Sequence, residues 1–330
     1  MEYRKEYKGK TVLVTGGAGC IGSNLTRALL EADVEKVIIL DDLSAAVEWN
    51  IPNDKRVKFI KGSVVLNKDL MKCFYYRPTI VFHLAAHFAN QNSIDHPIKD
   101  LETNGIGTMK TLGYAMMSKV ERFVYASSGC SVYGSQAPLP LKEDYISINL
   151  DTHYQIHKLL GECYCNFFYN YYKLPVTRAR FFNVFGKFEL PGLYRNVIPN
   201  FIWKALHNKP LVITGTGEET RDFTYVDDIV DGTLRLGVMK EAVGEAFNLA
   251  SSIETRVIDI ANHINQITGN NKIEYTNKRS WDKIDRRRAS IKKAQKVLGY
   301  QPQTLINVGI KNTYNWILEN KDKIERDAKF

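Results

Sequence analysis

The chain has 330 residues, of which 44% are hydrophobic and 25% are charged. This composition is that of an ordinary globular protein, and it excludes a small disulfide-stapled module or a mainly disordered chain. Lysine and arginine total 45 against 36 acidic residues, and the resulting net charge of +9 favours phosphorylated or otherwise anionic ligands.

The first half of the chain alternates short apolar strands with helices. Strands are predicted at residues 11–15, 37–40, 57–60, 80–84 and 123–126, and a helix at 21–32 follows the first of them. This alternation is typical of βαβ units. We therefore expect an α/β fold with a Rossmann-type, doubly wound parallel sheet that is covered by helices on both faces.

A long helix is predicted at residues 155–173, and its apolar side chains cover more than one stripe. Such a helix should be buried on two sides, either between layers of the domain or against a second copy, so we expect a homodimer. After a strand at 176–182, glycine and proline become frequent. We predict a Rossmann domain at 1–183, to which 222–250 returns, and a smaller α/β substrate domain at 184–330.

A glycine-rich motif joins the first strand to the first helix. Its glycines, Gly16, Gly19 and Gly22, follow a G-x-x-G-x-x-G spacing. Glycine permits a tight turn and a close approach of the backbone to a pyrophosphate, which the start of a helix attracts. A plain strand-to-helix turn is the alternative interpretation, but the strand before and the helix after favour a dinucleotide site.

Two acidic residues, Asp41 and Asp42, stand at the end of the second predicted strand, roughly 20 residues after the glycine motif. A carboxylate there can accept hydrogen bonds from the adenosine ribose and would repel a 2′-phosphate. The position favours NAD over NADP as the cofactor. The alternative is an acidic residue that only closes the turn after the strand.

Tyr154 and Lys158 lie four residues apart at the start of the long helix, and therefore on one face of it. An ammonium about 5 Å from a phenol favours the phenolate by roughly 3 kcal/mol. We therefore expect Lys158 to lower the pKa of Tyr154. Together with the dinucleotide motif and a serine-rich strand end, this pair indicates an acid/base site.

Several classes of site and location find no support in the sequence. Five cysteines without a C-x-x-C pair, and histidines without a ligand-like spacing, predict no metal site. The charged first ten residues resemble no signal peptide, and no apolar run is long enough to span a membrane. We expect a cytoplasmic protein with no membrane or nucleic-acid partner, although ten basic residues lie between positions 272 and 296.

Taken together, these residues resemble the extended short-chain dehydrogenase/reductase family, in its NAD-dependent sugar-nucleotide epimerase/dehydratase branch. The resemblance covers nearly the whole chain and rests on nine motifs. They are Gly16–Gly22, Asp41, His83–Ala86, Asn104–Thr108, Ser127–Gly134, Tyr154 with Lys158, Arg180–Asn183, Arg221–Phe223 with Asp227 and Asp228, and Arg279–Asp282. It implies an enzyme of nucleotide-sugar metabolism, in a pathway such as polysaccharide biosynthesis.

The resemblance implies a role for each matching position. Tyr154 would be the acid/base on the sugar hydroxyl, and Lys158 would hold the nicotinamide ribose. NAD would lie against Gly16, Gly19, Cys20, Ile21, Gly22, Asp41, Ser63, Val64, Leu84, Ala85, Ala86, Asn104 and Ser127. The diphosphate of the substrate would face Asn183, Asn196, Arg221 and Arg279.

Three positions depart from the family pattern. Gly129 stands where the family has a serine or threonine that touches the reacting sugar oxygen, so Ser131, or failing that Ser128 or a water, is expected to replace it. Glycine here should also leave room for about one side chain. Cys130 and Ser131 stand where 4,6-dehydratases have an acidic pair, which disfavours dehydration. Ser63 replaces an acidic residue that often faces adenine.

The sequence therefore predicts a sugar-nucleotide 4-epimerase that acts through a transient 4-keto sugar, with a UDP-sugar as the favoured substrate. Alternatives are an NAD-dependent sugar-nucleotide dehydrogenase or decarboxylase, and a GDP-sugar epimerase, which the Ser-Ser-x-Cys pattern ending at Cys130 also resembles. A non-enzymatic dinucleotide sensor is the alternative outside enzymes, because fold alone does not fix function.

Overall fold

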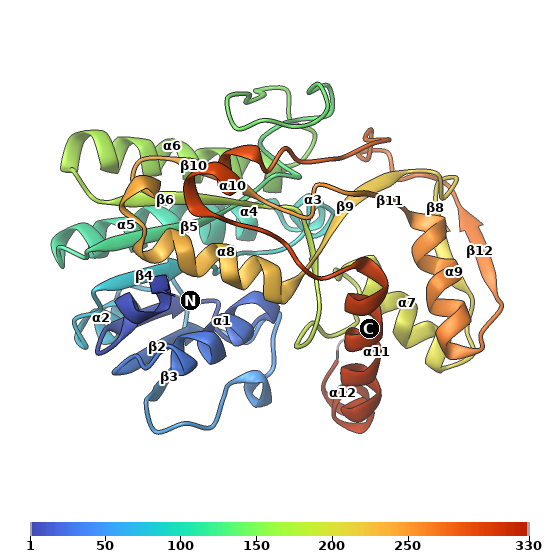
Figure 1. Cartoon of the computed structure of the whole chain (residues 1–330), viewed down its shortest axis with the longest axis horizontal. Coiled ribbons are helices and arrows are strands. Elements are labelled where there is room, and N and C mark those ends of the chain that lie inside the picture. The colour runs from blue at the N-terminus through green and yellow to red at the C-terminus, as the bar shows by residue number, and fades with distance from the viewer. Residues whose placement is uncertain (1, 329–330) are drawn as a thin grey trace.

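A computed structural model describes residues 2–328. Figure 1 shows two lobes, with the larger one built on a seven-stranded sheet. The strands of this sheet are β1 (Thr11–Thr15), β2 (Lys36–Asp41), β3 (Val57–Lys61), β4 (Ile80–His83), β5 (Arg122–Ser128), β6 (Val176–Phe181) and β10 (Ala246–Leu249). All pair in parallel, in the order β10-β6-β5-β4-β1-β2-β3, which confirms the predicted fold class.

Alternating side chains divide the core of this lobe between the two faces of the sheet. Val12 and Val14 of β1 lie in one buried cluster, whereas Leu13 between them lies in the other. The helices α1 (Cys20–Glu31) and α8 (Val226–Val238) pack on the first face, and α2 (Asn67–Phe74), α5 (Thr108–Met117) and α6 (His153–Tyr172) cover the second. Both faces are therefore buried, as a parallel sheet requires.

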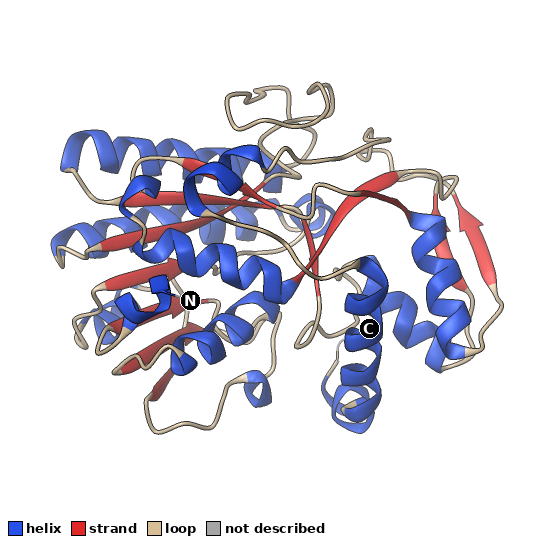
Figure 2. Cartoon of the chain, in the orientation of Figure 1, coloured by secondary structure: helices blue, strands red, loops and turns tan. Residues whose placement is uncertain are grey.

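The smaller lobe is built from two short sheets and their helices, as Figure 2 shows by secondary structure. The strands are β7 (Asn183–Phe185), β9 (Thr220–Tyr225) and β11 (Glu254–Arg256) in one sheet, and β8 (Leu211–Thr214) and β12 (Ile273–Thr276) in the other. The helices that pack there include α7 (Val197–Leu206), α9 (Val257–Thr268) and α11 (Ile306–Glu319).

The remaining helices are short. They are α3 (Asn90–Asp95), α4 (Pro97–Asp100), α10 (Lys292–Leu298) and α12 (Lys321–Asp327). The chain returns to the large lobe through α8 and β10, and α10 packs beside β10. Within residues 2–328, none of the helices has the length and hydropathy that crossing a membrane would need.

Helix α6 has a buried face and an exposed aromatic face. Its inner face packs on β5 and β6, and a buried ion pair between Glu162 and Arg180 of β6, 2.9 Å apart, fixes it there. On the outer face, Phe167, Tyr171 and Tyr172 remain 44–69% exposed. Phe167 stacks on Tyr171, and Tyr172 meets both rings edge to face. One of the two sequence expectations placed this helix between two layers of its own chain. The exposed aromatic face shows that this expectation was wrong.

Candidate active site

One cavity of about 790 Å³ opens along the carboxyl ends of the parallel strands. Its walls come from the glycine-rich turn, the ends of β2, β4 and β5, the start of α6, and the segments 183–201 and 279–287. Nineteen residues predicted from the sequence line it: Gly16, Gly19, Cys20, Ile21, Gly22, Asp41, Ser63, Val64, Leu84, Ala85, Ala86, Ser127, Ser128, Tyr154, Lys158, Asn183, Asn196, Arg221 and Arg279. Asn104 and Ser131 do not line it.

The turn between β1 and α1 fits the pyrophosphate of a dinucleotide. Gly16 has a φ of +71°, and a Cβ there would lie 2.7 Å from the nitrogen of Ala85. A Cβ on Gly22 would lie 2.3 Å from the carbonyl oxygen of Gly16. No side chain caps the start of α1 at Gly19, so the first N–H groups of the helix are available to an anion.

Asp41 connects this turn to the end of β2. Its carboxylate accepts hydrogen bonds from the backbone N–H groups of Ala18, at 3.0 Å, and Leu43, at 2.9 Å. Burial raises the pKa of Asp41, while these two bonds act in the opposite direction. Each oxygen therefore already has one donor and keeps a lone pair for another, which suits a ribose hydroxyl.

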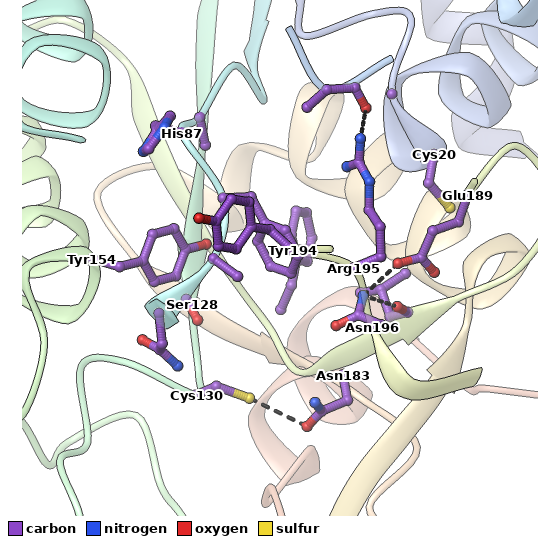
Figure 3. A pocket seen from close by; sticks show the side chains of 18 of the residues that line it. Cys20, His87, Ser128, Cys130, Tyr154, Asn183, Glu189, Tyr194, Arg195 and Asn196 are labelled. Carbon is purple, nitrogen blue, oxygen red and sulfur yellow. Dashed lines mark hydrogen bonds between the residues drawn. The ribbon is translucent and has the colours of Figure 1, made fainter. Parts of the chain in front are cut away.

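The start of α6 places Tyr154 in the cavity wall, where Figure 3 shows its ring near Ser128. Thr152 caps the helix by accepting from the N–H of Gln155, and the hydroxyl of Ser93 accepts from the N–H of Tyr154. Phe88 meets the Tyr154 ring edge to face at 6.0 Å. The helix starts two residues earlier than predicted, because the Thr152 cap sets its beginning.

Burial dominates the electrostatics of the Tyr154 and Lys158 pair. The Lys158 ammonium lies 5.6 Å from the centre of the Tyr154 ring and donates to the carbonyl oxygen of Ala126 at 2.8 Å. Burial lowers the pKa of Lys158 to about 8, and burial together with the negative charge of Asp100 raises the pKa of Tyr154. The expected lowering of the phenol pKa by Lys158 is therefore not found in the protein alone.

Asn104 lies beneath the cavity wall rather than in it. Its side-chain amide exchanges hydrogen bonds with both backbone groups of His87, at 2.9 and 3.1 Å, and donates to Asp100 at 2.9 Å. Asp100 is fully buried and also accepts from His157 at 2.5 Å. Asn104 thus holds the loop after β4, and it is this loop that lines the cavity. The prediction that Asn104 itself lies against the cofactor is therefore corrected, because its side chain is not part of the cavity wall.

The turn after β5 places Ser128, not Ser131, in the cavity wall. The N–H groups of Ser131 and Val132 both donate to the carbonyl oxygen of Ser128, so the chain turns at once and strand alternation stops. Ser131 is fully buried, and its hydroxyl has no hydrogen-bond partner within the described residues. Its predicted place on the cavity side is therefore wrong.

Gly129 does not leave the space expected for it. A Cβ on Gly129 would lie 2.1 Å from the ring of Phe182, which is 3% exposed and lines the cavity. The aromatic ring occupies the volume that a hydroxyl-bearing side chain would need. The sequence did not indicate this contact, because Phe182 lies more than 50 residues away, directly after β6.

The residues predicted to face a diphosphate come from three separate segments. Arg221 of β9 is held by the carboxylate of Asp282, with both oxygens 3.1 Å from its guanidinium. Arg279 lies over the ring of Trp281, at 5.8 Å. Asn183 is the first residue of β7 and accepts a weak hydrogen bond from the Cys130 thiol, whose pKa burial raises. Their guanidinium and amide groups suit phosphate oxygens.

Arg287 and Glu189 are among the charged residues of the wall that the sequence interpretation missed. Arg287, one of the ten basic residues between positions 272 and 296, is 2% exposed and donates to the carbonyl oxygens of Gly134 and Cys130. Glu189 is 6% exposed and accepts from Asn196 at 2.6 Å. Only the tertiary fold buries these two side chains, so no local pattern signals them.

Comparisons with known proteins agree with this geometry. The family model described as "NAD dependent epimerase/dehydratase family" matches residues 12–250. The chain is 34% identical to the UDP-glucose 4-epimerase of Mycolicibacterium smegmatis, over 91% of this chain and 96% of that protein. It is 32% identical to a UDP-N-acetyl-alpha-D-glucosaminuronate decarboxylase of Bacillus cytotoxicus, over 94% of this chain and 98% of that one.

Two solved structures are similar over almost their full length. An epimerase from Methanothermobacter thermautotrophicus is 52% identical, with a TM-score of 0.99 over 100% of this chain and 98% of that one. The enzyme WbmF of Bordetella bronchiseptica, solved with NAD+ and UDP, is 34% identical, with a TM-score of 0.86 over 98% and 96% of the two chains.

Proposed function

Since this chain belongs to the NAD-dependent epimerase/dehydratase family, we propose that it is a sugar-nucleotide 4-epimerase that acts on a UDP-sugar. NAD is its cofactor. The observation that carries the proposal is that one cavity is lined by the glycine-rich turn, by Tyr154 and Lys158, and by Arg221 and Arg279. A dinucleotide and a diphosphate sugar can therefore meet at one phenol.

Bound NAD supplies a hydride acceptor and, in its oxidised form, a positive charge. The part proposed for Tyr154 is to take the proton of the sugar 4-hydroxyl and to return it once the sugar has presented its other face. Burial raises the pKa of this phenol in the protein alone, so Tyr154 must first release its own proton to solvent before it can accept the sugar's proton. The positive charges of Lys158 and of oxidised NAD favour this release. Lys158 keeps its ammonium charge below pH 8 and stabilises the phenolate when it forms.

Ser128 is proposed as the hydroxyl that contacts the reacting oxygen, in place of the family residue at Gly129. It ends β5 beside Tyr154 in the cavity wall. Its neighbour Ser127 is instead engaged with Glu162 at 2.5 Å, which ties β5 to α6. Elimination of water is disfavoured, because Cys130 and Ser131 after Gly129 carry no carboxylate that could act as general acid.

The homodimer also remains a proposal, with the outer face of α6 as its contact surface. This face carries the exposed aromatic residues Phe167, Tyr171 and Tyr172, and the exposed Ile156 lies on the same helix. Large apolar side chains clustered on the surface are typical of protein interfaces. The division into domains is also a proposal: residues 1–183, together with 222–250, form the first domain, and the rest of 184–330 forms the second.

A sugar-nucleotide decarboxylase is the second candidate. One observation favours it: the Arg287 guanidinium lines the cavity, is buried, and has no carboxylate within ion-pair distance in residues 2–328. A buried cation of this kind suits an acidic sugar. The Cys130 thiol in the wall is what keeps a GDP-sugar epimerase open as a further alternative.

The proposal is tested by incubating the NAD-loaded protein with UDP-, GDP-, CDP- and dTDP-sugars and following the sugars by NMR. We expect inversion at C4 of a UDP-sugar, with no net NADH. Loss of carbon dioxide, or NADH formed in stoichiometric amount with the product, would establish the second candidate or a dehydrogenase. An unchanged spectrum for every sugar would contradict the epimerase proposal.

A further inference from the structure

A carboxyl group without a cation partner is built into the cavity wall at Glu189. One of its oxygens, Oε1, accepts from the side-chain amide of Asn196 at 2.6 Å. The other, Oε2, is buried and has no hydrogen-bond partner in the described part of the chain. The residue is 6% exposed, and in residues 2–328 no lysine, arginine or histidine lies within ion-pair distance of it.

No group around Glu189 forms an ion pair with it within residues 2–328. Arg195, on the same loop, directs its guanidinium to the carbonyl oxygen of Ala45, although its positive charge still acts to lower the pKa of Glu189. From α1, Cys20 presents a thiol whose pKa is raised by burial, by Glu189 itself and by Asp227 of α8. From the start of α7, Asn196 contributes only neutral donors, its side-chain amide and its backbone N–H.

Glu189 lies between the two places where this protein is expected to hold phosphate. Cys20 belongs to the uncapped N-terminus of α1 at the glycine-rich turn, and Asn196 is the N-cap residue of α7. Figure 3 shows the Glu189 side chain between these two residues. Both helix ends attract anions, whereas an ionised carboxylate between them would repel a diphosphate.

We infer that Glu189 binds the diphosphate of a ligand in its protonated form, so that ligand binding takes up one proton from solvent. The neutral carboxyl donates from Oε2 to a phosphate oxygen and keeps its contact with Asn196 through Oε1. The inference rests on the proposed function, because both NAD and a nucleotide sugar bring a diphosphate to this cavity.

Burial supports the same conclusion by raising the pKa of Glu189 to about 7, so the ligand-free protein is about half ionised at neutral pH. If the complex is fully protonated, proton uptake is about 0.9 per ligand at pH 8 and about 0.1 at pH 6. Affinity should fall about tenfold between these two values.

The test is calorimetry at pH 6, 7 and 8 in pairs of buffers with different ionisation enthalpies, which reports protons taken up on binding. The probes are NAD added to cofactor-free protein, and UDP-glucose added to NAD-loaded protein. In neither probe does the diphosphate carry a proton that titrates near neutrality, because each is a diester. The arm that shows the uptake identifies which of the two diphosphates faces Glu189.

The matched variants are Glu189→Gln, which keeps an acceptor for Asn196 and a permanent donor, and Glu218→Gln, which changes an exposed carboxylate outside the cavity wall. We expect Glu189→Gln to bind with an affinity independent of pH and without proton uptake, and Glu218→Gln to behave as the parent. Parent protein that binds both probes without uptake overturns the inference, as does uptake that persists in Glu189→Gln. Absence of UDP-glucose binding would instead count against the proposed substrate, while the NAD arm still decides the role of Glu189.

Discussion

Introducing the family hydroxyl at Gly129 should destabilise the protein rather than improve the enzyme. In Gly129→Ser the new Cβ would lie 2.1, 2.4 and 2.6 Å from three atoms of the Phe182 ring. Phe182 is 3% exposed and packs near Tyr133, with ring centres 6.3 Å apart, so it cannot swing aside without moving its neighbours. Forcing atoms into a packed core costs about 1 to 3 kcal/mol.

We expect urea denaturation to show a loss of that size for Gly129→Ser, and the melting temperature to fall by about 1 to 4 °C for a chain of 330 residues. Replacing Phe182 by alanine in the same chain should remove the clash, and a double-mutant cycle should give a coupling energy of about 1 kcal/mol or more between the two positions. Gly129→Ser with the stability of the parent would refute the reasoning. So would a pair of changes whose effects simply add.

Three further outcomes are expected at the cavity. Tyr154→Phe should lower turnover by a factor of about 100 or more while the NAD content of the purified protein stays unchanged, and a loss below tenfold would point to another base. Ser128→Ala should lower turnover at least tenfold and Ser131→Ala much less. Steady-state kinetics of both variants measure this ranking, and the opposite order would contradict it. Burial lowers the pKa of Lys158 to about 8, so its ammonium charge is lost as the pH rises through 8 and kcat should fall above that pH. Lys158→Arg should remove this inflection from the pH profile. A profile of the parent that stays flat to higher pH would contradict the assignment.

The strands β1 to β6 were predicted to within about two residues because each is a short run of apolar residues that the sheet buries, whereas β7 to β12 were not predicted. Val12 to Val14 have no exposed surface. Because all three are apolar, the sequence did not show which of them faces which of the two core clusters. The glycine turn was equally clear, since Gly16 and Gly22 have no space for a Cβ. Local sequence thus determines the part of the site that lies at the ends of regular elements.

The rest of the site depends on contacts between distant segments. The place of Ser131 was wrong because a turn begins at Ser128, which the alternation of a strand does not anticipate. The ring at Gly129 belongs to Phe182, which directly follows β6, and Asn104 reaches the cavity only through the loop that it holds. Glu189 and Arg287 are buried only by the tertiary fold, so their place in the cavity wall could not be predicted from the sequence.

The cavity wall is built in two different ways, and this difference bears on how such an enzyme can evolve. Tyr154 and Lys158 stand on a helix that the buried pair of Glu162 and Arg180 ties to the central sheet. The segments 183–201 and 279–287 also line the cavity, but much of their length is loop. Mutations in these loops can alter which sugar is accepted while the redox chemistry stays intact, so one ancestral scaffold can diversify its substrates without rebuilding its catalyst.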